Sequence, residues 1–271
     1  MGLSLSLILP PVLASIIGSF AVVRWQPPGQ VVSGVQHFTA GVVLAALASE
    51  LLPEVKKEGN WLWAGIGFVL GVALMLGLSQ FSRSMEARYE NAKSLRKAAI
   101  LPIGLIVAVG VDLLVDGVLV GLGSTLSFSQ GLVLAAALTL EILFVGVSLT
   151  LTLKAQGIRP LIAASATSAL SLFTFVGALI ALFLLAGAPV QVLAAVLAFG
   201  AAALLYLVVE ELLVEAHEHR ETALLTALFF VGFLCVYVFC RIGRMTACAR
   251  AVNLRKTGTR LDRVLIDSIE S

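Results

Sequence analysis

The sequence predicts an all-α, polytopic membrane protein with eight transmembrane helices, and three observations support this prediction. Of the 271 residues, 59% are hydrophobic and only 13% are charged, whereas soluble domains are about half apolar and about a quarter charged. The apolar residues gather in eight stretches, each close to the roughly 20 residues that a helix needs to cross a bilayer. Proline, glycine and polar residues separate these stretches. Lipid must therefore be the solvent for most of the chain.

The predicted transmembrane domain covers residues 1–241. Its spans lie at about 3–23, 31–52, 61–81, 98–122, 129–153, 160–186, 189–214 and 222–241. The first stretch contains Pro10 and Pro11 and has no basic residue before Arg24, so we interpret it as a span and not as a cleaved signal peptide. Residues 27–29 separate the first two spans, and residues 187–189 separate the sixth from the seventh.

The basic residues predict the orientation of the spans. Residues 82–97 are the longest internal polar segment and are predicted as a loop with five basic residues. The loops on the same face carry nine Lys or Arg, against Lys56 and Lys57 on the opposite face. Because basic residues concentrate in cytoplasmic loops, we place 82–97 in the cytoplasm and both termini outside it. The hydrophilic tail, 242–271, is also basic and favours the opposite orientation, but residues far from a span carry less weight.

Other features of the composition exclude functions. The formal net charge of +2 is too small to indicate a nucleic-acid partner. The three cysteines, Cys235, Cys240 and Cys248, form neither a disulfide framework nor a Cys-x-x-Cys zinc pair.

Acidic residues inside the apolar stretches are the candidates for function, because an ionisable group at the bilayer centre costs roughly 2.5–3.5 kcal/mol. The fourth span contains Asp112 and Asp116, which are four residues apart and share one helix face. Like charges at this distance repel unless a cation lies between them or a proton neutralises one. The pair is therefore a cation site, a proton carrier, or both.

Three further spans supply acids. Glu141 lies in the fifth span, Glu50 in the second, and Glu210 and Glu211 in the seventh, while no span centre supplies a Lys or Arg. Such an all-oxygen cluster is suited to a hard or borderline divalent cation. For Glu141 the alternative is a protonated acid bonded to a neighbouring helix. For Glu50 and Glu211, nearer helix ends, it is a side chain that reaches the interface.

The second and seventh spans end alike. Residues 50–54 read Glu-Leu-Leu-Pro-Glu and residues 211–215 read Glu-Leu-Leu-Val-Glu, and the same shift of 161 residues pairs Phe38 with Phe199. Two segments that lie five spans apart must cross the membrane in opposite directions. An inverted repeat around the fourth and fifth spans would produce this pattern, which is typical of alternating-access transporters.

These residues and their order resemble the ZIP family of divalent-metal transporters. The family has spans with His-Leu-Leu-Pro-Glu, His-Asn-x-Pro-Asp/Glu-Gly, a related fifth-span motif and Glu-Leu-Leu-Pro-Glu, whose counterparts here are 50–54, 112–117, 141–146 and 211–215. The resemblance implies a 3+2+3 inverted-repeat arrangement and a metal path between spans two, four, five and seven. It is also compatible with a homodimer and with the inner (plasma) membrane of a bacterium.

The chain departs from the family pattern at several of these positions. Asp112 stands where the family has His, Leu113 where it has Asn, and Val145 where it has the second acid of the fifth span. Val115 and Phe144 replace two prolines. The loss of imidazole shifts the expected preference away from zinc, toward manganese, magnesium, calcium or iron(II).

We therefore expect a transporter of divalent metal cations (zinc, manganese, iron or a similar ion), with one metal site and no prosthetic group. Its partners are the cation and membrane lipid. The expected ligands are Asp112, Asp116, Glu141, Glu211 and Glu50. The alternative is a transport-inactive or regulatory ZIP-like protein with a degenerate metal site. Enzymatic activity is not expected, because the Tyr-Asp and Gly-x-Gly-Asp motifs of intramembrane proteases do not occur, nor does Gly-x-Ser-x-Gly or His-Glu-x-x-His.

Overall fold

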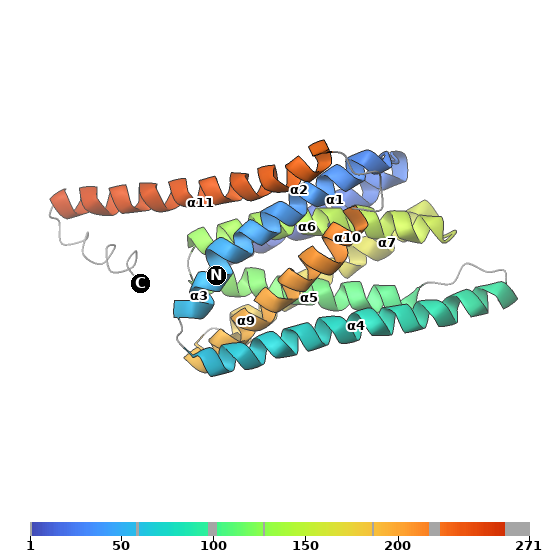
Figure 1. The fold of residues 1–271 in the computed structure, drawn as a ribbon, viewed down its shortest axis with the longest axis horizontal. Helices are drawn as coiled ribbons and strands as arrows, with labels where there is room; N and C mark the ends of the chain where they lie inside the picture. Colours follow the sequence, from blue (N-terminus) through green and yellow to red (C-terminus); the bar gives the residue numbers. More distant parts are fainter. Residues whose placement is uncertain are drawn as a thin grey trace.

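The computed structural model describes residues 2–57, 60–96, 102–126, 128–185, 187–216 and 223–257. Over these residues every regular element is a helix (Figure 1). In chain order the helices are α1 (Gly2–Arg24), α2 (Gly29–Ala46), η1 (Leu47–Leu51), α3 (Leu52–Lys57), α4 (Trp61–Arg96), α5 (Ile103–Leu126), α6 (Phe128–Ala155), α7 (Pro160–Leu170), α8 (Leu172–Ile180), η2 (Ala181–Leu185), α9 (Val190–Tyr206), η3 (Leu207–Leu212), α10 (Leu213–Ala216) and α11 (Ala223–Thr257).

Eight helical stretches are long and apolar enough to cross a membrane. They are Ser6–Arg24, Gly29–Lys57, Trp61–Met85, Ile103–Ser124, Gly131–Ala155, Pro160–Leu185, Val190–Glu210 and Ala223–Cys240. Each lies within a few residues of a predicted span. The chain is therefore an all-α protein with the helices of an integral membrane protein, as the distribution of apolar residues predicts.

Two polar segments differ from their predicted form. Helix α4 continues to Arg96 through most of the predicted loop 82–97, and α11 continues to Thr257 into the predicted tail 242–271. Both extensions project beyond the bundle, at opposite ends of the molecule (Figure 1). Their sequences lack proline and are rich in Ala and Arg, which favour helix in water as well as in lipid. Charge decides which solvent surrounds a segment and not whether the segment is helical.

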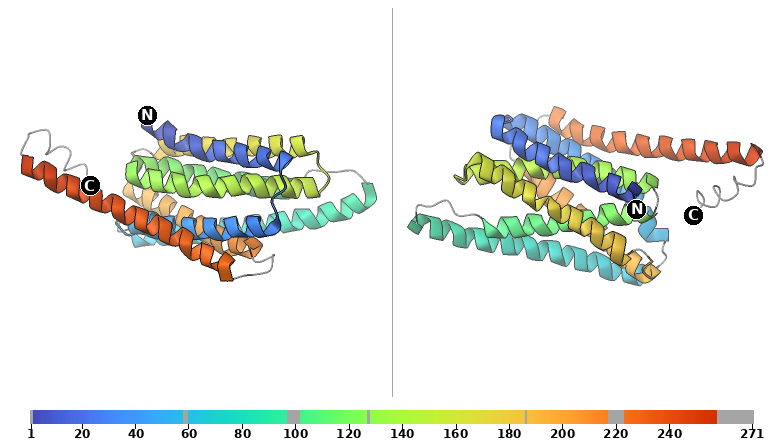
Figure 2. Two further views of the ribbon diagram at one scale, coloured as in Figure 1. Left: turned by 90° about the horizontal axis from the view of Figure 1, so that it is seen from above. Right: turned by 180° about the vertical axis from the view of Figure 1, so that it is seen from behind.

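The helices pack mainly in four pairs, namely α1 with α6, α5 with α8, α2 with α11, and α4 with α9 (Figure 2). Small residues allow close approach between the backbones of membrane helices. In the pair α5–α8, a Cβ atom at Gly117 would lie 2.0 Å from the carbonyl oxygen of Thr174, and one at Gly177 would lie 2.0 Å from that of Leu114. The pair can form only because both positions lack a side chain.

The second and seventh spans each contain a π-helical turn. The turn Leu47–Leu51 includes Glu50, and the turn Leu207–Leu212 includes Glu210 and Glu211. A π-helical turn holds an additional residue and rotates the helix face that follows it, and such turns are frequent at functional sites. Both turns therefore alter the direction in which the span's acidic residues point.

Candidate metal centre

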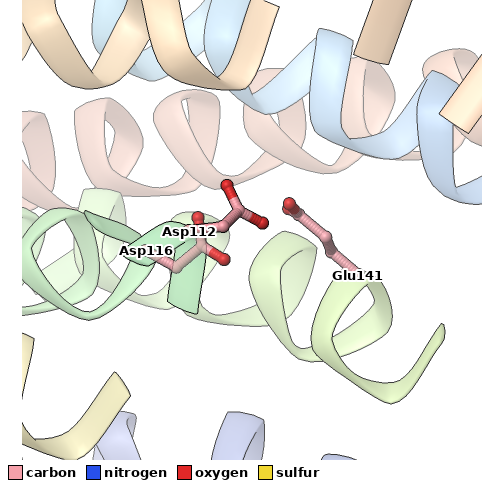
Figure 3. A group of neighbouring side chains, drawn as sticks. All are labelled: Asp112, Asp116 and Glu141. Atoms are coloured by element: carbon pink, nitrogen blue, oxygen red, sulfur yellow. The ribbon is translucent and has the colours of Figure 1, made fainter. Parts of the chain in front are cut away.

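Three of the predicted ligands converge between α5 and α6. Asp112 and Asp116 project from α5 and Glu141 from α6, and one carboxylate oxygen of each lies within 4.8 Å of the others. Figure 3 shows the carboxyl groups of these residues gathered between the two helices. The side chains of Asp112, Asp116 and Glu141 are only 8%, 1% and 0% exposed. The four-residue spacing of the aspartates and the packing of α5 against α6 together create this cluster.

The spacing of the oxygens matches the size of a coordination sphere. Oxygen ligands lie about 2.0–2.6 Å from Mg²⁺ or Ca²⁺, so two ligands on opposite sides of one ion are about 4 to 5 Å apart. The three oxygens lie within 4.8 Å of one another, so they can contact a single cation after small side-chain movements. The donors are all carboxylates, which suit magnesium, calcium and manganese better than zinc. The cluster can therefore hold one hard divalent cation.

A cavity of about 380 Å³ leads to this cluster, and its lining includes Asp112 and Glu141. This volume lies within the usual range of ligand pockets. The cavity also reaches Ser82 on α4, Leu105 near the start of α5 and Thr152 near the end of α6. These positions lie at the end of the bundle beyond which α4 extends. The cavity therefore runs from the buried carboxylates toward one face of the membrane domain.

Hydroxyl groups line the cavity between its mouth and the cluster. Ser148 and Thr152 on α6 and Ser79 on α4 are among them. Glu141, Ser148 and Thr152 follow one another at spacings of seven and four residues, so they share one face of α6. The Thr152 hydroxyl donates a hydrogen bond of 3.0 Å to the Ser148 carbonyl oxygen. A cation that loses water in this cavity would thus meet oxygen atoms along one side of its path.

The other two predicted ligands are not part of this cluster as the structure describes it. Glu50 is buried and lines a separate cavity of about 10 Å³ together with Glu54, which is space for about one water molecule. The Glu54 carboxylate also lies 3.6 Å from the Lys57 ammonium. The side chain of Glu211 lies outside the described residues. Asp112, Asp116 and Glu141 are therefore the site that the geometry supports.

The cavity is also lined by two charged residues that were not among the predicted ligands, Arg83 and Glu210. Glu210 is adjacent to the predicted ligand Glu211. Because both lie in a π-helical turn, a regular helical repeat does not predict which of them faces the cavity. For Arg83 a signal exists in the spacing of residues 75, 78, 79, 82 and 83, which share one face of α4 and line the cavity. That face becomes recognisable only when α4 is known to continue past residue 81. Neither protein-family models nor curated proteins give a match to the sequence.

Proposed function

We propose that the chain transports divalent metal cations, with Asp112, Asp116 and Glu141 as the ligands of the transported ion. The observation that carries this proposal is the convergence of three buried carboxylates, with oxygens within 4.8 Å of one another, at a cavity of about 380 Å³. Acidic groups inside a membrane domain are costly and are typical of ion pathways. A divalent cation bound between them removes most of that cost, and the cavity gives it a route.

The packing supports an inverted repeat of the 3+2+3 type, with spans one to three related to spans six to eight. When the two halves are superposed in this way, the pair α2–α11 corresponds to the pair α9–α4. In both pairs the two helices pack against each other extensively. A Cβ atom at Gly232 on α11 would lie 2.2 Å from the carbonyl oxygen of Phe38 on α2. One at Gly71 on α4 would lie 2.5 Å from that of Phe199 on α9. The shift of 161 residues that pairs Phe38 with Phe199 also pairs Gly71 with Gly232.

The pairs that include the fourth and fifth spans, α5–α8 and α6–α1, correspond in the same way. A Cβ atom at Gly177 on α8 would lie 2.0 Å from the Leu114 carbonyl oxygen on α5. One at Gly18 on α1 would lie 2.6 Å from the Leu143 carbonyl oxygen on α6. A shift of 29 residues relates Leu114 to Leu143. The fourth span therefore contacts the second half of the repeat in the same way as the fifth span contacts the first half.

The same shift of 29 residues pairs Asp112 with Glu141. The two acids thus occupy equivalent places in the two halves and meet where the halves join. The long helices that end the halves, α4 and α11, project at opposite ends of the molecule, as an inverted repeat requires (Figures 1 and 2). Ion sites at repeat interfaces are typical of alternating-access transporters.

The two cavities suggest how access alternates. Four residues that line the small cavity of Glu50 have their repeat counterparts on the lining of the large one. The pairs are Leu51 with Leu212, Leu119 with Ser148, Gly123 with Thr152, and Leu134 with Leu105. When the halves exchange conformations, the small cavity opens and the large one closes. This exchange would give Glu50 a place on the route to the opposite face. By the distribution of basic residues, the large cavity opens to the cytoplasm.

Diffraction from crystals grown with Mn²⁺ tests the site directly. We expect an anomalous peak at the manganese edge between Asp112, Asp116 and Glu141. A Glu54→Gln variant, which changes a buried carboxylate in the other cavity, should keep the peak. Saturating Mn²⁺ without density at the cluster, or with density only at other residues, would contradict the assignment.

The ion preference is testable at Asp112. We expect Asp112→His to raise the affinity for Zn²⁺ relative to Mn²⁺ by about tenfold or more, because an imidazole nitrogen suits zinc better than a carboxylate does. Competition between the two ions for the purified protein measures the ratio. Glu54→Gln should leave the ratio unchanged. An unaltered ratio in Asp112→His would mean that Asp112 is not a ligand.

A further inference from the structure

Two residues of opposite charge line the cavity outside the carboxylate cluster. Arg83 extends from α4 and Glu210 from η3, and both side chains are exposed. Among the described residues of the lining, Arg83 is the only basic one. Both charges therefore lie on the wall of the cavity that leads to the three acids.

Packing contacts define the depth of Arg83 along the cavity. Met75 on α4 is buried against Val115, the neighbour of Asp116. Arg83 is eight residues further along α4, which corresponds to about 12 Å toward the mouth. A Cβ atom at Gly104 on α5 would lie 3.2 Å from the Ser82 carbonyl oxygen, and Asp112 is eight residues beyond Gly104. Both helices thus place Arg83 roughly 12 Å from the level of the acids.

A charge at this distance acts strongly on a divalent ion. Coulomb's law at about 12 Å gives a change in affinity of about threefold with the dielectric constant of water, and about 100-fold with an effective value of 20. The positive charge of the guanidinium repels the ion. A carboxylate on the wall of the same cavity, such as that of Glu210, attracts the ion and acts in the opposite direction.

We propose that Arg83 sets the affinity and the release rate of the cation at this mouth, and that Glu210 opposes it. The inference rests on the proposed function, because it concerns the same ion and the same cavity. Arg83 repels the cation bound by the three acids, lowers its affinity from this side and speeds its release to this face. Glu210 raises the local cation concentration. The two charges thus act on the bound ion in opposite directions.

Equilibrium binding of Mn²⁺ to the purified full chain in lipid nanodiscs tests this inference. In 0.01 M salt we expect Arg83→Gln to tighten binding by about 3- to 30-fold and Glu210→Gln to weaken it by a similar factor. Arg83→Lys retains the charge and should bind like the wild type. In 1 M salt the Debye length falls from about 30 Å to about 3 Å, so both effects should nearly vanish.

Two matched controls separate a local effect from a general change of surface charge. Arg24 ends α1 and Arg159 precedes α7, on the same predicted membrane face as Arg83. Both are exposed, and neither lines the cavity. Arg24→Gln and Arg159→Gln remove the same charge and should leave the affinity within about twofold of the wild type.

The outcomes separate this inference from the proposed function. If the wild type binds Mn²⁺ but Arg83→Gln binds it equally or more weakly, the inference is overturned and the metal site remains. If the wild type shows no saturable binding of Mn²⁺, both are overturned. Should Arg83→Gln fail to fold, Glu210→Gln still decides, because unchanged or tighter binding in that variant contradicts the proposed balance of charges.

Discussion

Replacing Asp116 by alanine is expected to reduce divalent-cation uptake by at least about 100-fold. Changing a group that merely supports a metal ligand costs about 10- to 100-fold in affinity or activity, and Asp116 is proposed as a ligand itself. Its side chain is 1% exposed, so water can replace the lost oxygen only at the cost of rearrangement. Uptake of Mn²⁺ into proteoliposomes that contain a manganese-sensitive dye measures the effect. The isosteric Asp116→Asn variant should lose uptake to a similar degree.

Glu54→Gln provides the control for this experiment. Glu54 is also a buried carboxylate, but it lines the other cavity and lies beside Lys57. Its loss should change uptake far less than the loss of Asp116. Equal uptake by Asp116→Ala and the wild type would remove the three acids from the transport path.

Thermal unfolding separates loss of the site from loss of the fold. A ligand at 100 times its Kd stabilises the folded state by about 2.7 kcal/mol, so Mn²⁺ should raise the Tm of the wild type and of Glu54→Gln. Asp116→Asn should fold and yet show little of this increase. A wild type that is stabilised by Mn²⁺ but takes up none would favour the regulatory alternative over transport.

The spans and the three clustered carboxylates were predictable because their signals are local. A run of apolar residues long enough to cross a bilayer needs no knowledge of its neighbours. An acid within such a run is also conspicuous, because its burial has to be compensated. The spacing of Asp112 and Asp116 puts both on one helix face. That Glu141 would meet them follows from the packing of α5 against α6, which the sequence suggests only through resemblance to a family.

The positions of the other charged residues near the cavities could not be predicted from a regular helical repeat. The π-helical turns rotate the ends of the second and seventh spans, so the sequence could not decide between Glu210 and Glu211. The turn in the second span contains Glu50, which lines a separate cavity. Arg83 was assigned to a loop because it is charged, whereas the helix continues through it. In each case a nonlocal contact or an irregular turn decides the direction of a side chain.

Gly117→Ala is expected to lower the free energy of unfolding by about 1–3 kcal/mol or more, the usual cost of overpacking. Its Cβ atom would lie 2.0 Å from the Thr174 carbonyl oxygen, and a backbone carbonyl cannot rotate away as a side chain can. Helices α5 and α8 must therefore separate. Because Gly117 follows Asp116 on α5, the separation should also displace this proposed ligand and weaken Mn²⁺ binding. Chemical denaturation in mixed micelles and Mn²⁺ titration measure the two effects.

Gly77→Ala is the matched control. Gly77 is an exposed glycine of α4, and a Cβ atom there would meet nothing within 4 Å. Alanine favours helix over glycine by about 1 kcal/mol, so this variant should be as stable as the wild type or more so. Gly177→Ala should destabilise like Gly117→Ala, since its Cβ atom would press on the Leu114 carbonyl oxygen in the same contact. The double variant should cost less than the sum of the two, because helices that have already separated leave room for the second methyl group. Additive losses, or a Gly117→Ala variant as stable as Gly77→Ala, would show that α5 and α8 do not share this close crossing.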